Sequence, residues 1–276
     1  MNRLRAWFLA PSWIVTVSLF LVPLAIILFY SFLTRGNYGG VVLDWSSDSY
    51  RRLADPLYGM ILLRTFWIAG VSSLLCMLLG FPLALFISRS GARKNLYLSL
   101  VILPFWTSFL VRTYAWMFLL RDTGLINTAL QSMGLIHSPL PLLYNDGAVI
   151  LGLVYSYLPF MVLPLYATLE RLDPNLLEAA ADLGAKPGAT LTRVILPLCA
   201  PGIRAGTVLV FIPCLGAYLT PDLLGGGKSV MAGNLIQNQF TNARDWPFGS
   251  AAALALMAIV MLLLLAFVRS DQEGLL

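Results

Sequence analysis

Apolar runs long enough to cross a lipid bilayer divide the sequence into alternating hydrophobic and polar segments. An α-helix needs about 20 mostly apolar residues to cross the roughly 30 Å hydrocarbon core of a bilayer. Hydrophobic residues make up 59% of the 276 residues and charged residues only 11%, which is too few charges to coat a soluble fold of this size. The sequence therefore predicts an all-α integral membrane protein whose six spans lie at about residues 13–32, 60–87, 96–120, 147–169, 203–219 and 248–268.

The first run is expected to remain in the membrane as an uncleaved span. It is too long for the core of a cleaved signal peptide, and no small-residue cleavage site follows it. No segment outside the six runs is long enough to bury a core of its own. We therefore expect residues 1–276 to form a single membrane domain.

Proline residues predict irregularities within two of the spans. Pro159 and Pro164 predict a kink in the fourth span, because proline removes a backbone hydrogen bond from a helix. The fifth span is expected to break at Thr220-Pro221 for the same reason.

Two external loops are expected to contain a short helix each. Residues 47–53 fit one short helix after the first span. Residues 125–133 carry one apolar face, which predicts an interfacial helix that Gly134 ends.

The distribution of basic residues predicts the orientation. Six spans place both ends of the chain on the same side, and Lys and Arg are enriched in cytoplasmic segments. With both ends in the cytoplasm, the internal segments hold ten basic residues and the external segments hold six, which is a bias of the expected sign. The ten are Arg3, Arg5, Arg89, Arg93, Lys94, Arg171, Lys186, Arg193, Arg204 and Arg269. The six are Arg35, Arg51, Arg52, Arg121, Lys228 and Arg244.

Residues 172–201, between the fourth and fifth spans, form a cytoplasmic segment of a different kind. Asp173 and Pro174 fit the N-cap and first position of a helix, and Gly184 fits its end. A second helix is expected over residues 187–196, ending before Pro197. Leucines and alanines exposed on such a helix pair are unfavourable in water, so either a partner protein or the bilayer surface must cover them.

The spacing within this segment resembles the EAA loop of binding-protein-dependent ABC importer permeases. The matching positions are Glu178, Ala179, Ala180, Gly184, Val194, Leu196 and Pro197, with Val194 at a place where that family usually has isoleucine. The resemblance implies the type I importer fold and a coupling helix that seats in a cleft of an ATP-binding subunit. The residues implied in ATPase coupling are Glu178, Ala179, Ala180, Gly184, Ala185 and Pro197.

Four further runs resemble the spermidine/putrescine branch of that family, and in particular its first permease subunit. They cover residues 103–116, 123–127, 219–240 and 245–251. This resemblance implies polyamine import through a pore of which the chain forms half. The implied partners are a second permease subunit, two copies of an ATP-binding subunit and an external or periplasmic binding protein.

The sequence offers little support for chemistry carried out by this chain. It contains no phosphate-binding P-loop, so ATP and Mg are expected on the partner ATPase and no cofactor is expected here. The single histidine, His137, lies in an external loop, and no metal-binding cluster is apparent. Cys76, Cys199 and Cys214 have no paired spacing and are expected to be buried thiols.

Candidate substrate contacts come from charged and aromatic residues in the spans. Arg112 and Asp222 reach similar depths and could form an intramembrane ion pair, or Asp222 could receive an ammonium group of the substrate. Aromatic rings could bind a polyamine by cation–π contacts, although interface anchoring or packing would also explain them. The aromatic candidates are Trp106, Tyr114, Tyr155 and Tyr157.

Two alternatives to polyamine import remain open from the sequence. The same architecture could import another small solute, such as an amino-acid-derived compound, sulfate or an iron chelate. A passive membrane channel would also fit the apolar composition, but it would not account for the EAA spacing.

Overall fold

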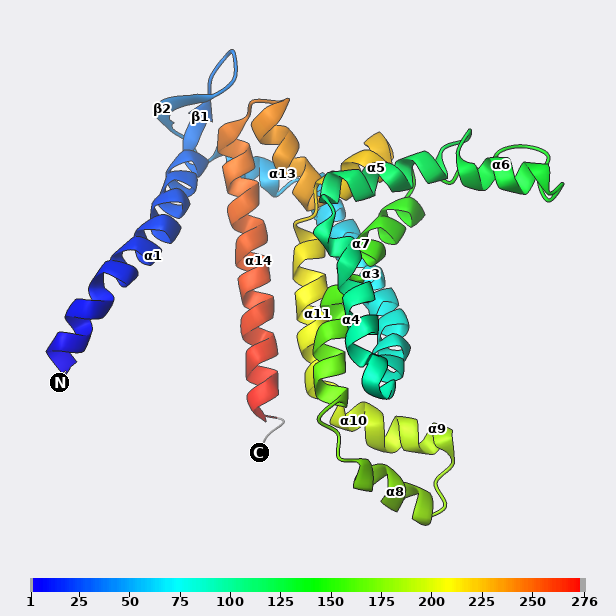
Figure 1. Cartoon of the computed structure of the whole chain (residues 1–276). Helices are drawn as coiled ribbons and strands as arrows, with labels where there is room; N and C mark the ends of the chain where they lie inside the picture. Colours follow the sequence, from blue (N-terminus) through cyan, green and yellow to red (C-terminus); the bar gives the residue numbers. More distant parts are fainter. Residues whose placement is uncertain (1, 274–276) are drawn as a thin grey trace. The chain divides into compact units, whose positions relative to one another are not determined.

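The computed structural model describes the backbone of residues 2–273 and the side chains of residues 13–267. Helices form most of this part of the chain, and one antiparallel pair of short strands is the only sheet in it (Figure 1). The chain forms two compact units. One unit is Leu62–Asn234, and the other combines the residues up to Ile61 with those from Leu235 onward.

The second of these units contains the first and last helices. Its elements are α1 (Asn2–Ser31), β1 (Leu33–Arg35), β2 (Val41–Trp45), α2 (Asp48–Leu53), most of α13 (Ala232–Thr241) and α14 (Trp246–Glu273). Helices α1 and α14 pack against each other. The Arg35 guanidinium donates to the Ala243 carbonyl at 2.7 Å, and the Gly40 N–H donates to the Arg244 carbonyl at 2.8 Å. These bonds fasten the β1–β2 hairpin to the turn before α14.

A buried carboxylate caps α14 in the same unit. Asp245 is only 1% exposed, and its Oδ1 accepts a hydrogen bond from the Phe248 N–H at 3.2 Å. Arg52 donates to Oδ2 at 2.7 Å, and the centre of its guanidinium lies 4.4 Å from the centroid of the Phe248 ring. Burial lowers the pKa of Arg52, but the hydrogen bond and charge of Asp245 outweigh that effect and raise the pKa. The ion pair therefore ties α2 to the first turn of α14.

The unit Leu62–Asn234 holds most of α3 and the elements that follow it. They are α3 (Pro56–Ser88), η1 (Gly91–Arg93), α4 (Lys94–Ile102), η2 (Leu103–Trp106), α5 (Phe109–Leu120), α6 (Leu125–Ser132), α7 (Asp146–Leu169), α8 (Pro174–Asp182), α9 (Pro187–Thr190), η3 (Leu191–Ile195), α10 (Leu196–Leu198), α11 (Ala200–Leu215), α12 (Leu219–Gly225) and η4 (Gly226–Lys228). Helix α7 is the centre of this unit, because it has buried residues along its whole length. The Cys76 thiol of α3 lies 3.7 Å from the Val154 carbonyl of α7, so α3 runs along one side of α7.

Small residues bring α11 close to α7. Gly202 and Gly206 are four positions apart and therefore lie on one face of α11. A Cβ added at Gly202 would lie 2.5 Å from Oγ1 of Thr168, and one at Gly206 would lie 2.6 Å from Sδ of Met161. Only glycine leaves room for this approach, which is a common way to pack helices within a membrane.

The helices of membrane length agree in part with the six predicted spans. Four continuous stretches qualify: Trp13–Ser31, Pro56–Ser88, Asp146–Leu169 and Trp246–Phe267. Two bent pairs qualify only when their halves are taken together: Gly91–Trp106 with Phe109–Ser132, bent by 89°, and Pro187–Leu198 with Ala200–Leu215, bent by 67°. The described part of the chain thus has four continuous membrane-length helices and up to six spans.

The third predicted span, over residues 96–120, is not a single straight helix in the structure. Helix α4 ends at Ile102, η2 follows it, and Thr107 has an extended backbone with ψ 152°. Helix α5 then begins after the 89° bend, as Figure 1 shows. Pro104 has no N–H to donate, and its carbonyl accepts from Thr107 Oγ1 at 2.7 Å and from Arg112 Nη1 at 3.2 Å. These side-chain bonds replace the helical ones and stabilise the bend.

The predicted break of the fifth span at Thr220-Pro221 is also misplaced. Helix α11 ends at Leu215, and α12 begins at Leu219. Thr220 and Pro221 therefore lie in the first turn of α12, where a missing N–H costs nothing. The helix α13 in the following loop was not predicted.

Several local predictions are confirmed. Helices α2 and α6 form where the two short loop helices were expected, and Gly134 follows α6 with φ 71°. The three cysteines are buried and unpaired. Pro159 and Pro164 both lie inside α7, while the kink expected there stays a prediction.

Candidate functional site

The segment after α7 forms the predicted helix, glycine turn and second helix. Asp173 Oδ1 accepts from the Asn175 N–H at 3.0 Å, which caps α8, and Pro174 occupies its first position. In Figure 1 the helices α8, α9 and α10 lie at one end of the unit Leu62–Asn234, and α5 and α6 lie at the other. We call residues 172–201 the coupling segment, after the role that the resemblance to the EAA loop implies for it.

Gly184 ends α8 in the left-handed conformation with φ +75°. Its N–H donates to the Ala181 carbonyl at 2.8 Å, and the Ala185 N–H donates to the Ala180 carbonyl at 3.0 Å. This pair of bonds is the Schellman motif. A Cβ at Gly184 would meet no atom of this chain within 4 Å, so the space beside the turn is open.

The side chains of α8 divide into an inward and an outward set. Ala180 is buried against the chain, whereas Glu178 and Ala179 are exposed. Leu183, directly before the glycine turn, is 88% exposed. An apolar side chain projecting this far beside an acidic residue is what a protein partner would cover. Of the remaining coupling candidates, Ala185 is partly exposed and Pro197 is exposed.

The second helix of the coupling segment runs further than predicted. It continues through Pro197 to Leu198 instead of ending before the proline. The turn that precedes the proline, η3, is π-helical. A π turn shifts the hydrogen-bond pattern, and this lets the helix tolerate a residue that has no N–H.

The coupling segment is seated against the ends of α3 and α7. A cavity of about 280 Å³ lies between them, lined by Leu85, Ser88, Arg89, Leu169, Glu170, Leu172, Pro174, Leu177 and Ile195. Glu170 forms an ion pair with Lys94, and the hydrogen bond from Lys94 holds the pKa of Glu170 below its usual range. Because that pKa is lowered, the pair stabilises the fold at neutral pH and its contribution is lost as the pH falls through the pKa.

The structure separates the aromatic substrate candidates. Trp106 is 86% exposed beside the bend after α4, and Tyr114 on α5 is also exposed. Tyr155 and Tyr157 lie on α7. The ring centroids of Tyr155 and Trp116 are 5.5 Å apart in an edge-on arrangement, and those of Tyr157 and Phe160 are 6.1 Å apart. No ring contact among the described residues joins these four candidates to one another.

The ion pair considered between Arg112 and Asp222 is not formed. Arg112 is only 8% exposed, donates to the Pro104 carbonyl and lies within 6 Å of the Phe105 and Phe109 ring centroids. Its charge is therefore used to stabilise the bend between α4 and α5. Asp222 lies on α12 with an exposed side chain, and no ion pair of the described residues includes it.

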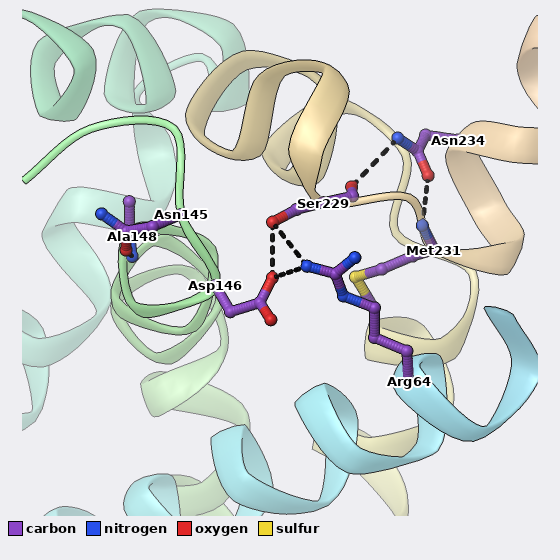
Figure 2. Close-up of polar contacts among 7 residues, drawn as sticks. All are labelled: Arg64, Asn145, Asp146, Ala148, Ser229, Met231 and Asn234. Atoms are coloured by element: carbon purple, nitrogen blue, oxygen red, sulfur yellow. Dashed lines mark hydrogen bonds and ion pairs between the residues drawn. The ribbon is translucent and has the colours of Figure 1, made fainter. Parts of the chain in front are cut away.

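A polar cluster that the sequence did not predict joins α3, α7 and the loop after η4. Arg64 Nη2 lies 2.6 Å from Oδ1 of Asp146, and the Ser229 hydroxyl donates to the same oxygen (Figure 2). An arginine inside an apolar span usually has a partner, which was the available signal. The partner itself is 82 positions away and could not be identified from the pattern.

Further hydrogen bonds hold the loop that carries Ser229. Asn234 Oδ1 accepts from the Met231 N–H at 2.7 Å, and Thr65 Oγ1 accepts from the Ala232 N–H at 2.9 Å (Figure 2 shows the first). Residues 229–234 are thereby fixed to the first turns of α3 that belong to this unit. The cluster of Arg64, Asp146 and Ser229 is called the polar node below.

A cleft of about 510 Å³ opens at the same end of the unit. It is lined by Arg121, Asp122, Thr123, Pro141, Leu143, Tyr144 and Lys228. These residues come from the ends of α5 and η4 and from the segment before α7.

Membrane-length helices and an exposed helix–turn–helix segment with the EAA spacing are the features expected of a membrane transport subunit. The family described as "Binding-protein-dependent transport system inner membrane component" matches residues 76–270, and the chain belongs to this family. It is therefore a permease component of bacterial inner membranes.

Curated relatives match nearly the whole chain. It is 43% identical over 252 residues to "Spermidine/putrescine transport system permease protein PotB" of Escherichia coli strain K12, covering 91% of this chain and 92% of that protein. The protein of the same name from Haemophilus influenzae is 40% identical over 262 residues, covering 95% and 91%.

A solved structure confirms the fold. A bacterial ABC transporter that imports the acidic polysaccharide alginate superposes with a TM-score of 0.75 at 18% identity, covering 99% of this chain and 97% of that one. The fold is thus the type I ABC importer permease fold that the sequence predicted.

Proposed function

We propose that this chain is a permease subunit of an ATP-driven importer of spermidine and putrescine. The observation that carries the proposal is the 43% identity to a spermidine/putrescine permease over 91% of the chain. Because the match extends over nearly the whole sequence, it includes the pore-forming helices as well as the coupling segment.

The chain works in this proposal as half of a translocation pore. A second permease subunit supplies the other half, two copies of an ATP-binding subunit drive the cycle, and a periplasmic binding protein delivers the substrate. ATP and Mg belong to the ATP-binding subunit, and this chain binds no cofactor. The permeases alternate their access as the ATPase subunits close and open.

The coupling segment is the proposed contact with the ATP-binding subunit. Glu178, Ala179 and Gly184 face outward from α8, while Ala180 and Ala185 hold the turn through their backbone bonds. Pro197 lies exposed in the second helix of the segment. This arrangement supports a partner that approaches the glycine turn closely.

The proposed orientation places both ends of the chain and the coupling segment in the cytoplasm. The excess of basic residues in the segments assigned to that side supports it. The outer ends of α3 and α7, with the polar node, then face the periplasm.

The proposed substrate path uses aromatic faces and carboxylates. Trp106 and Tyr114 are exposed enough to meet a cation, as is Asp222. Tyr155 and Tyr157 are the weaker candidates, since both already pack against other rings.

Uptake in vesicles reconstituted with the permease pair, the ATP-binding subunits and the binding protein tests the proposal. We expect labelled spermidine and putrescine to accumulate only with internal ATP and external binding protein. Flux without either would indicate a channel. ATP-dependent accumulation of labelled sulfate or of an iron chelate, with no accumulation of polyamines, would assign another cargo.

A further inference from the structure

The carboxylate of Asp146 is held in place yet only partly used. Both Arg64 and Ser229 bond to its Oδ1, and no hydrogen bond of the described residues ends on Oδ2 (Figure 2). The side chain of Asp146 is 40% exposed. The carboxylate therefore has a fixed position and one oxygen open to a further cation.

Arg64 is the cation of the protein that pairs with this carboxylate. Its side chain is 37% exposed, and the same nitrogen that meets Asp146 lies 3.4 Å from the Ser229 hydroxyl. An ion pair between side chains this exposed contributes little to stability. A primary or secondary ammonium group carries the same charge and can donate to the same oxygens, so it can replace the guanidinium at little cost.

The other carboxylates of this unit are less suited to receive a cation. Four lie at the coupling end: Glu170, Asp173, Glu178 and Asp182. Asp122 lines a cleft that Arg121 and Lys228 also line, so it is surrounded by positive charge. Asp222 is exposed, and no ion pair of the described residues orients it. Asp146 is the carboxylate at this end that the protein both orients and leaves accessible.

We propose that Asp146 receives one ammonium group of the substrate, and that Arg64 is a tethered competitor which holds the site when substrate is absent. This inference rests on the proposed function, since it requires a polyamine cargo. An ammonium group that arrives at Oδ2 repels the guanidinium because both are positive, so Arg64 is released from Oδ1 and its bond to Ser229 is also lost. Residues 229–234 are then less firmly tied to α3.

The test is equilibrium binding of labelled spermidine to the purified permease–ATPase complex without binding protein. Asp146→Asn should raise the Kd about tenfold, because a charged hydrogen bond is lost. Arg64→Gln should lower the Kd about threefold, because the competitor is gone. Opposite shifts of the two Kd values would distinguish this role from a purely structural ion pair. Loss of either partner of a structural pair would weaken binding.

Matched controls use exposed charges at the same end of the unit. Asp122→Asn and Arg121→Gln change the net charge in the same way and should leave the Kd within about twofold, because neither residue belongs to the node. Where Asp146→Asn fails to assemble, Arg64→Gln alone decides: tighter binding supports the proposal and weaker binding overturns it.

Three results would overturn the inference: shifts in the same direction, control variants that match the node variants, or no saturable binding by the unchanged complex. Any of these together with normal polyamine uptake in vesicles leaves the proposed function standing. Failure of polyamine uptake overturns both.

Discussion

Gly184 shows how much of the coupling segment depends on a single residue. Its left-handed φ allows the Schellman bonds that end α8, and the open space beside it allows another backbone to approach. Gly134, which ends α6, has nearly the same φ of 71° and equally open space. The chain thus offers two glycines with equal backbone demands, only one of them in the coupling segment.

We expect Gly184→Val to leave the complex in the membrane but to uncouple ATP hydrolysis from uptake. The left-handed conformation costs a valine about 1–2 kcal/mol, and the added side chain fills the space that a docked partner would use. Gly134→Val carries the same backbone cost and should retain transport. Substrate-stimulated ATPase activity and uptake measure the difference, and equal losses in both variants would show that strain alone is responsible.

A second residue-scale prediction concerns the buried Asp245. Asp245→Asn keeps a good N-cap for α14 but loses the ion pair with Arg52, whereas Asp245→Ala loses both. We expect the apparent Tm of the purified complex to fall in both, and further in the alanine variant, by the equivalent of about 1 kcal/mol for the cap. Identical Tm values for the two variants would show that the cap contributes nothing.

Residue patterns predicted the local contacts of the site better than the distant ones. Asp173, Pro174 and Gly184 act on backbone within a few positions of themselves, so their roles could be read from the sequence. The pairing of Arg64 with Asp146 depends on how α3 and α7 pack, which no local pattern encodes. For the same reason Arg112 was paired with the wrong partner.

At the scale of elements, continuous apolar character proved a good guide to helices that cross the membrane unbroken. It identified α3 and α7 within a few residues but hid the bend between α4 and α5. Both halves of that region are apolar, and the bend depends on the Pro104 carbonyl and two side chains that bond to it. A hydropathy profile does not detect hydrogen bonds of this kind.

The contact between α11 and α7 yields a prediction at the same scale. Gly206→Leu should force the two helices apart, because its side chain would overlap Met161, and overpacking of this kind costs about 1–3 kcal/mol or more. Ala205→Leu adds a larger side chain to an exposed face of the same helix and should be tolerated. Yield and thermal unfolding of the purified complex compare them, and equal stability of the two variants would contradict the packing argument.

At the scale of the whole molecule, α7 connects the end of its unit that holds the polar node with the end that holds the coupling segment. Asp146 is its first residue, and the coupling segment begins directly after its last turn. A helix of 24 residues is about 36 Å long, so the polar node and the coupling segment are joined by one continuous element. The type I fold was predictable because the EAA spacing is specific, whereas this connection required the structure.

The proposed orientation can be measured by cysteine labelling in cells. The native cysteines are buried and should react little, which gives a low background. With a membrane-impermeant maleimide, Lys228→Cys should be labelled in intact cells and Arg93→Cys, which is exposed and lies outside the coupling segment, only after permeabilisation. The opposite pattern would reverse the topology.

The bend after α4 also affects the lipid around the protein. From Leu96 to Trp106, seven α-helical and four 3₁₀ residues rise only about 19 Å, compared with a hydrocarbon core of roughly 30 Å. Such a hydrophobic mismatch is met by local thinning of the bilayer or by cover from neighbouring protein. In a bilayer of ordinary thickness, this half of the bent pair is therefore expected to reach the far surface only where one of these two accommodations is made.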